Sequence, residues 1–217
     1  MEWLTAFLLA LTALISAFTG VLLAFTKLKK QVEETIPSKI KRQSGIDTEI
    51  IRRMEQVKEL LNADRVQLYD FHNGEHYANG RSALKTSCTY EVLRQGITSH
   101  QMKLQSIPLS CIPKFIKTLL DKNQLEVKDI EDLKETMPAT YSLKKAQDIK
   151  SFYDIILNNK QGEPIGFIAI QYVNDYHKTY NNNDRESLLR LKFFIEENLE
   201  MLIKKVERRK VIWNMLN

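Results

Sequence analysis

The chain has 217 residues, 43% of them hydrophobic, and a formal net charge of +5 at pH 7. This length allows one ordinary domain with an additional segment, and the hydrophobic fraction is compatible with a real core. Seven glycines leave little material for phosphate-cradling loops, and the sequence contains no P-loop, dinucleotide-binding glycine motif, zincin pair or nucleophile elbow.

The N-terminal segment is uncharged from Trp3 to Thr26. A run of about 24 residues is long enough to cross the hydrocarbon core of a bilayer, about 30 Å thick, as a helix. A cleaved signal peptide is the alternative, but it would need a basic start and a shorter apolar region, whereas this chain begins Met1-Glu2-Trp3. We therefore expect residues 1–27 to form a retained transmembrane anchor.

Basic residues follow this segment, whereas only Glu2 precedes it. The bias predicts a single-pass membrane protein with the rest of the chain in the cytoplasm. Residues 28–45 are expected to form a basic juxtamembrane linker against anionic membrane lipid, with Pro37 breaking any helix that continues from the anchor. No nucleic-acid partner is expected, because no motif with interleaved aromatic residues accompanies the charges. The basic residues are Lys27, Lys29, Lys30, Lys39, Lys41 and Arg42.

The next region predicts a helix followed by a strand. Apolar residues recur at spacings of four, three and four over Ile46–Leu61, which indicates an amphipathic helix. Arg65–Phe71 is rich in aromatic and β-branched residues and predicts a strand. The apolar helix positions are Ile50, Met54, Val57 and Leu61.

The middle of the chain combines turn signals with short periodic runs. Asn73-Gly74 and Asn79-Gly80 favour tight turns, so His72–Arg81 is predicted to be a loop or hairpin tip. The elements expected after it are a strand over Ala83–Thr86, a short helix over Thr89–Gly96, a strand over Gln101–Ser110, a helix over Pro113–Asn123, a very short strand over Leu125–Val127, and short helices over Ile130–Glu135 and Thr140–Gln147.

The stretch Ser151–Val173 predicts a β-hairpin, because two apolar runs flank a turn that contains Asn, Gly and Pro. The second run is apolar on both alternating faces, which is typical of a central strand covered on both sides. Gln171 is the exception. Its amide must be satisfied in a core network or lie at the wall of a pocket.

A long final helix is predicted from Asp184, after a polar loop over Asn174–Asn183. Apolar residues keep a three-to-four spacing along it, with charge on the rest of its surface. They are Leu188, Leu191, Ile195, Leu199, Leu202 and Val206.

Two stretches carry a family resemblance: Leu60–Tyr69, read LLNADRVQLY, and Gly162–Ile170, read GEPIGFIAI. With the order of predicted elements, they resemble the GAF domain, a cytosolic sensor module. The resemblance implies an α+β fold over residues 46–217, with a GAF-like antiparallel sheet flanked by terminal helices, preceded here by one transmembrane helix. It also implies a ligand pocket beside the sheet and a homodimer formed through the terminal helices. Because the family has no invariant catalytic signature, it indicates fold better than function.

A narrower resemblance involves the stretch Phe71–Gly74 together with Lys85, Ser87, Tyr90 and Glu91. These residues resemble a group of small GAF-like proteins encoded by bacteriophages or prophages. No reaction is implied by it.

Polar and aromatic residues gather at the end of the first strand and in the loops after it. In a GAF-like fold these segments approach the pocket, where aromatic faces with amide and carboxylate edges suit a purine ring or another small polar ligand. The alternative is a hydrogen-bonded loop that closes the sheet. The candidate ligand-binding residues are Tyr69, Phe71, His72, Asn73, Tyr77, Tyr90, Glu91 and Gln171, with Asp70, Asn79 and Ser87 nearby.

Metal and thiol chemistry are weaker alternatives. His72 and His76 have a metal-ligand spacing on a helix, but Asn73-Gly74 disfavours a helix and no third ligand is evident, so no metal or cofactor is expected. Some GAF-fold enzymes reduce free methionine sulfoxide with pocket cysteines. The surrounding motif is lacking here, so Cys88 and Cys111 are expected to be inert, reduced thiols.

The sequence therefore favours a membrane-anchored, non-enzymatic, GAF-like sensory module that binds a small, nucleotide-like ligand or a protein partner in the cytoplasm. One alternative is a structural or interaction protein that recruits a partner to the membrane. The other is a cysteine-dependent enzyme similar to methionine sulfoxide reductases. Because the sequence contains no kinase or cyclase segment, the output of a sensor would lie in an unidentified partner.

Overall fold

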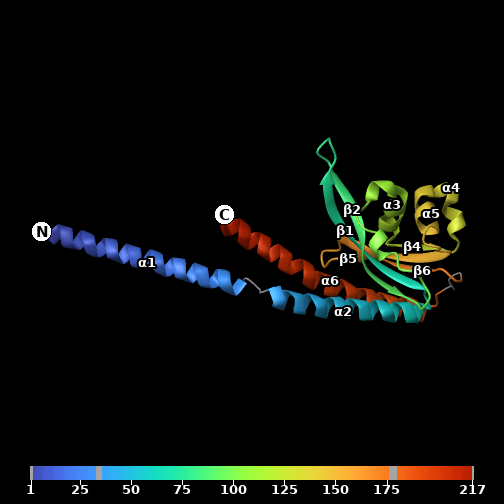
Figure 1. Ribbon diagram of the computed structural model, residues 1–217, viewed down its shortest axis with the longest axis horizontal. Coiled ribbons are helices and arrows are strands. Elements are labelled where there is room, and N and C mark those ends of the chain that lie inside the picture. The colour runs from blue at the N-terminus through green and yellow to red at the C-terminus, as the bar shows by residue number, and fades with distance from the viewer. Residues whose placement is uncertain (1, 33–35, 176–179, 217) are drawn as a thin grey trace. The chain divides into compact units, whose positions relative to one another are not determined.

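The computed structural model describes residues 2–32, 36–175 and 180–216, and the chain divides into two compact units, Met1–Gly45 and Ile46–Asn217 (Figure 1). The first unit contains helix α1 (Glu2–Val32) and the beginning of helix α2 (Ile36–Leu61). The second contains the rest of α2, all six strands and the remaining helices.

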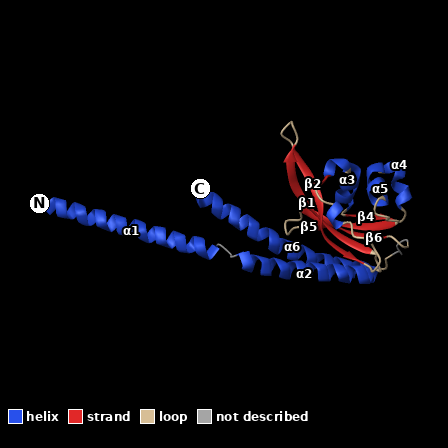
Figure 2. Ribbon diagram, viewed as in Figure 1, coloured by secondary structure: helices blue, strands red, loops and turns tan. Residues whose placement is uncertain are grey.

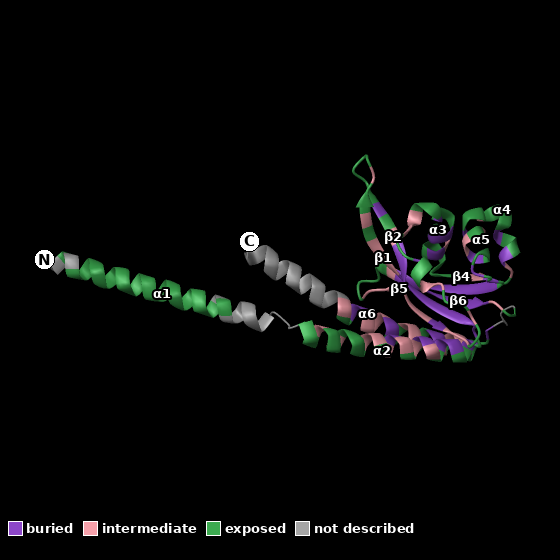
Figure 3. Ribbon diagram, viewed as in Figure 1, coloured by how far each residue is buried: buried purple, intermediate pink, exposed green. Residues whose placement is uncertain are grey.

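Helix α1 includes a segment, Thr5–Ala24, whose 20 residues are long and apolar enough to cross a membrane. All of its side chains are exposed (Figure 3). Its hydroxyl groups are satisfied within the helix, since Thr12 donates to the Leu9 carbonyl at 2.9 Å and Thr19 to the Ile15 carbonyl at 2.8 Å. Such a segment needs no water for its polar groups. The side chains of Lys27, Lys29 and Lys30 lie outside the described residues.

The predicted linker before residue 46 is helical where it is described. Helix α2 begins at Ile36 rather than at Ile46, so residues 37–45 are helical and Pro37 does not end a helix. Pro37 falls in the first turn, where its missing N–H has no intrahelical acceptor and its fixed φ suits the helix. Its effect is therefore to begin a helix. Residues 33–35, over which α1 was expected to continue to Pro37, lie outside the described residues.

A six-stranded antiparallel sheet, in the order β3-β2-β1-β6-β5-β4, forms the centre of the second unit (Figure 2). The predicted hairpin is confirmed: it forms β5 and β6, and β6 lies between β1 and β5. The strands are β1 (Arg65–His76), β2 (Ser82–Leu93), β3 (Ile107–Pro108), β4 (Gln124–Val127), β5 (Ser151–Asn158) and β6 (Pro164–Tyr172).

Both faces of the sheet are covered, as the apolar alternation of β6 predicted. One face packs on α2 and α6 (Asn182–Leu216), which lie side by side (Figure 1). The other face, called the α3–α5 face below, packs on the short helices. Ile168 and Ile170 point to the first face, whereas Phe167 and Ala169 point to the second. The short helices are η1 (Gln101–Lys103), η2 (Leu109–Cys111), α3 (Pro113–Lys122), η3 (Ile130–Asp132), α4 (Leu133–Thr136) and α5 (Pro138–Lys145).

The apolar seams of α2 and α6 face the sheet. All four α2 seam residues are buried. In α6, Leu188, Ile195 and Leu199 are buried, and Leu191 and Leu202 are partly buried against the same core. The side chain of Val206, and residues 176–179 of the loop predicted before α6, lie outside the described residues.

Two predicted elements after the first hairpin are wrong. Thr89–Gly96 is not a helix, because β2 continues to Leu93 and pairs with β1 as far as Arg65. Backbone pairing with a neighbouring strand overrides the local helical pattern there. Gln101–Ser110 contains η1 and only the two-residue strand β3. The helix over Pro113–Asn123 and the short strand over Leu125–Val127 are confirmed to within one residue.

The first Asn-Gly pair does not form a turn. β1 continues through Asn73-Gly74 to His76, and the pairing register with β2 shifts there. A side chain at Gly74 would place Cβ 2.4 Å from the Ala83 carbonyl oxygen, so glycine permits close approach of two strands rather than reversal of the chain. The tip lies at the second pair, where Gly80 has φ +78°.

Candidate functional site

The α3–α5 face carries a group of polar side chains that are buried in the middle of the sheet. Alternation on β1 places Arg65, Gln67 and Tyr69 on this face, while Val66 and Leu68 point to the α2–α6 face. Glu91 of β2 pairs across from Gln67, and Gln171 of β6 pairs across from Arg65. We call Arg65, Gln67, Tyr69, Glu91 and Gln171 the polar network.

Hydrogen bonds join the polar network across three strands. Arg65 Nη1 donates to Gln171 Oε1 at 3.0 Å, and Gln171 Nε2 donates to Gln67 Oε1 at 2.7 Å. The Tyr69 hydroxyl donates to the same Gln67 oxygen at 2.9 Å, and Gln67 Nε2 donates to Glu91 Oε1 at 2.8 Å. Of the two placements that the sequence left open for Gln171, a core network or the wall of a pocket, the structure shows the hydrogen-bonded network.

Glu91 fixes the segment that follows β2. Its carboxylate accepts the backbone N–H groups of His100 (3.1 Å) and Gln101 (3.3 Å), and it also accepts a hydrogen bond from the Ser99 hydroxyl. Donors from three successive residues thus converge on one carboxylate, which holds this segment against the sheet.

Arg65 supplies the opposing positive charge and has only 1% of its surface exposed. Its Nη2 donates to the Thr98 carbonyl at 2.9 Å and its Nη1 to the Gln147 carbonyl at 3.4 Å, while Nε lies 3.7 Å from Glu91 Oε1. Burial lowers the pKa of the guanidinium, and the Glu91 charge opposes that shift. Arg65 thus joins β1, the segment after β2 and the residues that follow α5.

A second buried ion pair lies on the same face. Lys144 Nζ of α5 donates to Asp154 Oδ2 of β5 at 3.1 Å, and the ammonium lies 4.1 Å from the centroid of the Phe152 ring and 5.6 Å from that of Phe115. Burial raises the pKa of Asp154 to about 6, although the Lys144 charge and hydrogen bond lower it. Here desolvation exceeds the attraction between the partners.

Three buried side-chain atoms on this face, among the described residues, make no hydrogen bond: Arg65 Nε, Gln147 Oε1 and Asp154 Oδ1. Buried polar atoms in folded proteins nearly always have partners, so each exception needs an explanation. One N–H donor and two acceptors are thereby available on the α3–α5 face.

Three of the predicted site residues, Tyr69, Glu91 and Gln171, belong to the polar network. Phe71 lies on the same face, where its ring is 5.9 Å from that of Phe167, and Phe167 stacks on Tyr69 at 4.6 Å. Arg65 and Gln67 were not among the predicted residues. The signal for them was the alternation Arg65-Val66-Gln67-Leu68-Tyr69, in which every second residue of a buried strand is polar.

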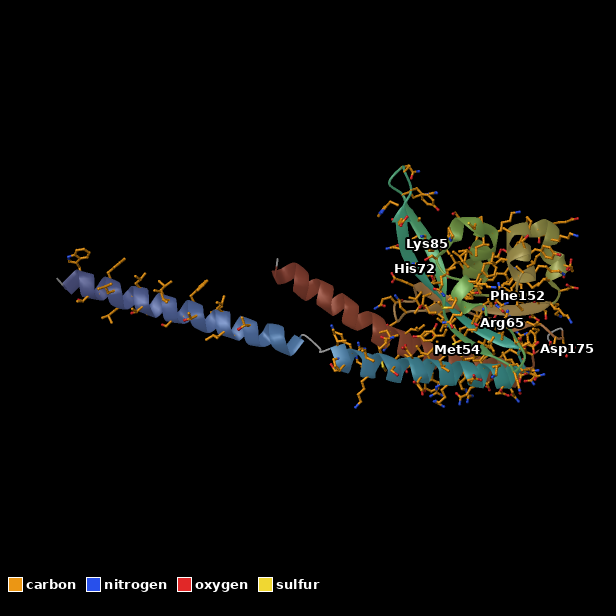
Figure 4. All side chains as sticks on the ribbon, viewed as in Figure 1. Met54, Arg65, His72, Lys85, Phe152 and Asp175 are labelled. Carbon is orange, nitrogen blue, oxygen red and sulfur yellow. The ribbon has the colours of Figure 1, made fainter. Side chains whose placement is uncertain are left out.

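The other predicted residues lie elsewhere. Tyr90 points to the opposite face, where its hydroxyl donates to Asp47 Oδ1 of α2 at 2.6 Å. His72, Asn73 and Tyr77 belong to the end of the β1–β2 hairpin, beyond Asp70, the last β1 residue that pairs with β6 (Figure 4). Because β1 extends past the rest of the sheet, residues adjacent in sequence are carried away from the polar network.

The structure gives no support for a metal site or a reactive thiol in the described residues. The described part of the chain contains no group of three or more His, Cys, Asp or Glu side chains able to hold a metal ion. His72 Nε2 instead lies 2.9 Å from Ser87 Oγ. Burial raises the pKa of the Cys88 thiol, which reduces the thiolate fraction that a reductase would need, while Cys111 is exposed.

Glu91 and Tyr90 offer a matched test, because these neighbours on β2 face opposite sides of the sheet. Glu91→Gln should lower the free energy of unfolding by about 3–5 kcal/mol, because it leaves the Arg65 charge buried without its counterion. Tyr90→Phe should cost only about 1 kcal/mol, the value of one hydrogen bond. Urea unfolding of the full chain in a non-ionic detergent measures both values, and equal losses would contradict the assigned role of the polar network.

Asp154 predicts a specific pH dependence of stability. Its pKa is about 6 in the folded chain against an ordinary value of 3.8, so the native state binds the proton more tightly than the unfolded state. Ionisation of Asp154 therefore lowers the free energy of unfolding by about 3 kcal/mol above pH 6. This loss disappears as the pH falls from 6 to 4, because the carboxyl group of the folded chain is then protonated. Asp154→Asn should remove this rise in stability on acidification. Asp121→Asn, at an exposed ion pair with Lys117, should keep it.

Comparison with known proteins was informative only at the level of structure. No protein-family model and no curated protein sequence matches the chain. The solved cyanobacteriochrome receptor PixJ superposes with a TM-score of 0.57 at 13% identity, over 74% of this chain and 99% of that one. The PixJ GAF domain of Thermosynechococcus elongatus, in its blue-light-absorbing form, gives 0.56 at 12% identity, over 77% and 94%.

A domain of a sensor histidine kinase protein from Sinorhizobium meliloti gives a TM-score of 0.50 at 13% identity, over 73% of this chain and 94% of that one. At these identities the likeness concerns the fold alone. It confirms the α+β architecture expected from the sequence, with an antiparallel sheet flanked on one face by the terminal helices. The second unit of the chain has a GAF-like fold.

Proposed function

We propose that the chain is a membrane-anchored regulatory module that binds a small ligand on the α3–α5 face of its sheet and acts without chemistry of its own. The observation that carries this proposal is the polar network, buried where an ordinary core would be apolar. Buried charges and amides cost stability relative to well-packed apolar side chains, so their presence indicates recognition. The sensory domains that share the fold support the same function.

The side chains around the polar network favour a flat, polar ligand such as a nucleotide base. Tyr69, Phe71 and Phe167 supply aromatic faces, and Gln67 and Gln171 supply amide edges. In the described structure the Gln67 amide accepts hydrogen bonds from Gln171 and Tyr69, and the aromatic rings pack on one another. A ligand would therefore exchange internal hydrogen bonds for its own, and the donor and acceptors without partners are available to it.

Helix α6 is the element suited to carry the output. Glu196 accepts the backbone N–H of Asn158 at 2.6 Å, and Glu200 accepts that of Lys160 at 3.1 Å. Both donors lie at the turn between β5 and β6, the strands that carry Asp154 and Gln171. A ligand that shifts these strands would thus shift α6 and change how it packs in a dimer or on a partner protein.

A thermal-shift screen of the full chain in detergent against nucleotides and other polar metabolites tests the proposal. A true ligand present at 100 times its Kd should raise the Tm by about 5–10 °C, because it binds only the folded state. Gln171→Leu should lose this shift, whereas Tyr90→Phe, on the opposite face, should retain it. Light scattering on the same samples reports whether the ligand changes the oligomeric state.

The alternative, an interaction protein with no ligand, gives a different result in that screen. Its specific support is the exposed apolar surface on α6, where Leu189 and Phe193 are each 55% exposed and Met201 is 57% exposed. No compound would then shift the Tm. Phe193→Lys would disrupt self-association or partner binding, whereas Gln171→Leu would have no effect on either.

We also propose that α1 anchors the chain with its GAF-like unit in the cytoplasm. Cys111 is exposed and Cys88 is fully buried, so the native chain carries one accessible thiol for a topology test. A membrane-impermeant maleimide should label intact cells that express the chain only after permeabilisation, and Cys111→Ser should abolish the label. Labelling without permeabilisation, or release of the chain from membranes by carbonate, would contradict the proposal.

A further inference from the structure

The side chain of Lys144 is buried among groups that recognise an ammonium ion. Its Nζ meets the Asp154 carboxylate at 3.1 Å and faces the rings of Phe152 and Phe115 at 4.1 Å and 5.6 Å from their centroids. We call Asp154, Phe152 and Phe115 the cation cage. Aromatic faces attract a cation through the ring quadrupole, and the attraction is strongest where water is excluded. The side chain of Lys144 is only 6% exposed and that of Asp154 is fully buried.

Lys144 uses only part of what the cation cage offers. An ammonium group has three N–H donors, and the hydrogen bond to Asp154 Oδ2 occupies one of them. Asp154 Oδ1 accepts nothing, and Gln147 Oε1, in the turn after α5, is also a buried acceptor without a partner. Asp154 Oδ1 is therefore an acceptor that the N–H donor of a ligand could use.

We propose that the cation cage is a binding site for a protonated organic amine, that Lys144 occupies it as a tethered stand-in, and that an amine-bearing ligand can take the place of Lys144. This inference rests on the proposed ligand-binding role of the α3–α5 face and specifies one chemical group of the ligand. The carboxylate requires N–H donors, and the aromatic rings favour an organic cation over a strongly hydrated metal ion.

Replacement of Lys144 would have a structural consequence. The ion pair with Asp154 joins α5 to β5, since the two residues lie on these two elements. Helix α5 has only eight residues, a length that is marginal for an isolated helix, so it depends on its contacts with the sheet. An amine in the cation cage would therefore loosen α5 and transmit its binding to β5.

Removal of the tethered ammonium allows a direct test. Lys144→Ala in the full chain, in detergent at pH 7.5, should lower the Tm, and 100 mM propylammonium chloride should raise it by about 4 °C if the Kd is on the order of 10 mM. Tetramethylammonium has the same charge but no N–H donor, and propanol has the shape but no charge. Neither should raise the Tm beyond the change seen with sodium chloride.

The double variant Lys144→Ala/Asp154→Asn separates the cation cage from nonspecific salt effects. It should lose the response to propylammonium. A response retained in the double variant, or absent from a folded Lys144→Ala variant, would overturn the proposal.

Hydrogen exchange of the wild-type chain decides the matter if Lys144→Ala does not fold. Propylammonium at 100 mM should speed exchange of the α5 amides several-fold relative to tetramethylammonium, because it displaces Lys144. Equal exchange in the two salts would refute displacement.

The two proposals can fail separately. If a metabolite raises the Tm of the wild-type chain but not of Gln171→Leu, and propylammonium does not raise the Tm of Lys144→Ala, the proposed function stands and this inference fails. If propylammonium raises the Tm of Lys144→Ala but no metabolite raises that of the wild-type chain, the cation cage stands without the wider ligand-binding role.

Discussion

The burial of the Arg65 guanidinium is the constraint on which the arrangement of the α3–α5 face depends. An ion of this size loses several kcal/mol when it leaves water, unless nearby groups replace its hydration. Those groups come from separate parts of the chain: the Gln171 amide on β6, the Thr98 and Gln147 carbonyls, and the Glu91 carboxylate on β2. Glu91 in turn holds the backbone at His100. One charged side chain thereby determines where several irregular segments lie.

The two faces of the sheet therefore have different physical roles. The α2–α6 face is an apolar core that provides stability through burial, and the long helices complete it. The α3–α5 face combines an apolar cluster with two buried ion pairs and a chain of amides, which contribute little net stability. Neighbouring residues on β2 show this division, since Tyr90 contacts α2 and Glu91 contacts Arg65. Buried polar contacts are thus concentrated on one face of the sheet, and apolar burial dominates the other.

The likeness to solved sensory domains, at 12–13% identity, concerns backbone architecture alone. Arg65, Glu91 and the Lys144–Asp154 pair place charged side chains inside that architecture. Asp154 and Gln171 lie on β5 and β6, and Glu196 and Glu200 of α6 accept backbone N–H groups at the turn between these strands. The same sheet that places the polar groups therefore connects them to a long helix.

The sequence by itself determined the elements whose pattern is strong and local. The apolar residues of α2 and α6 recur at helical spacing, and two apolar runs flank a turn in the β5–β6 hairpin. The uncharged segment within α1 is recognised by its length. Each of these patterns lies within one continuous stretch of sequence. The sequence also indicated that the Gln171 amide is either satisfied in a core network or at the wall of a pocket. Only the tertiary structure decided that Thr89–Leu93 is a strand, that Gly74 serves close approach, and that Tyr90 and Glu91 face opposite sides. The partners of Arg65, Gln67 and Lys144 lie on other strands and helices, and pairing between segments distant in sequence leaves no local signal in the residues themselves.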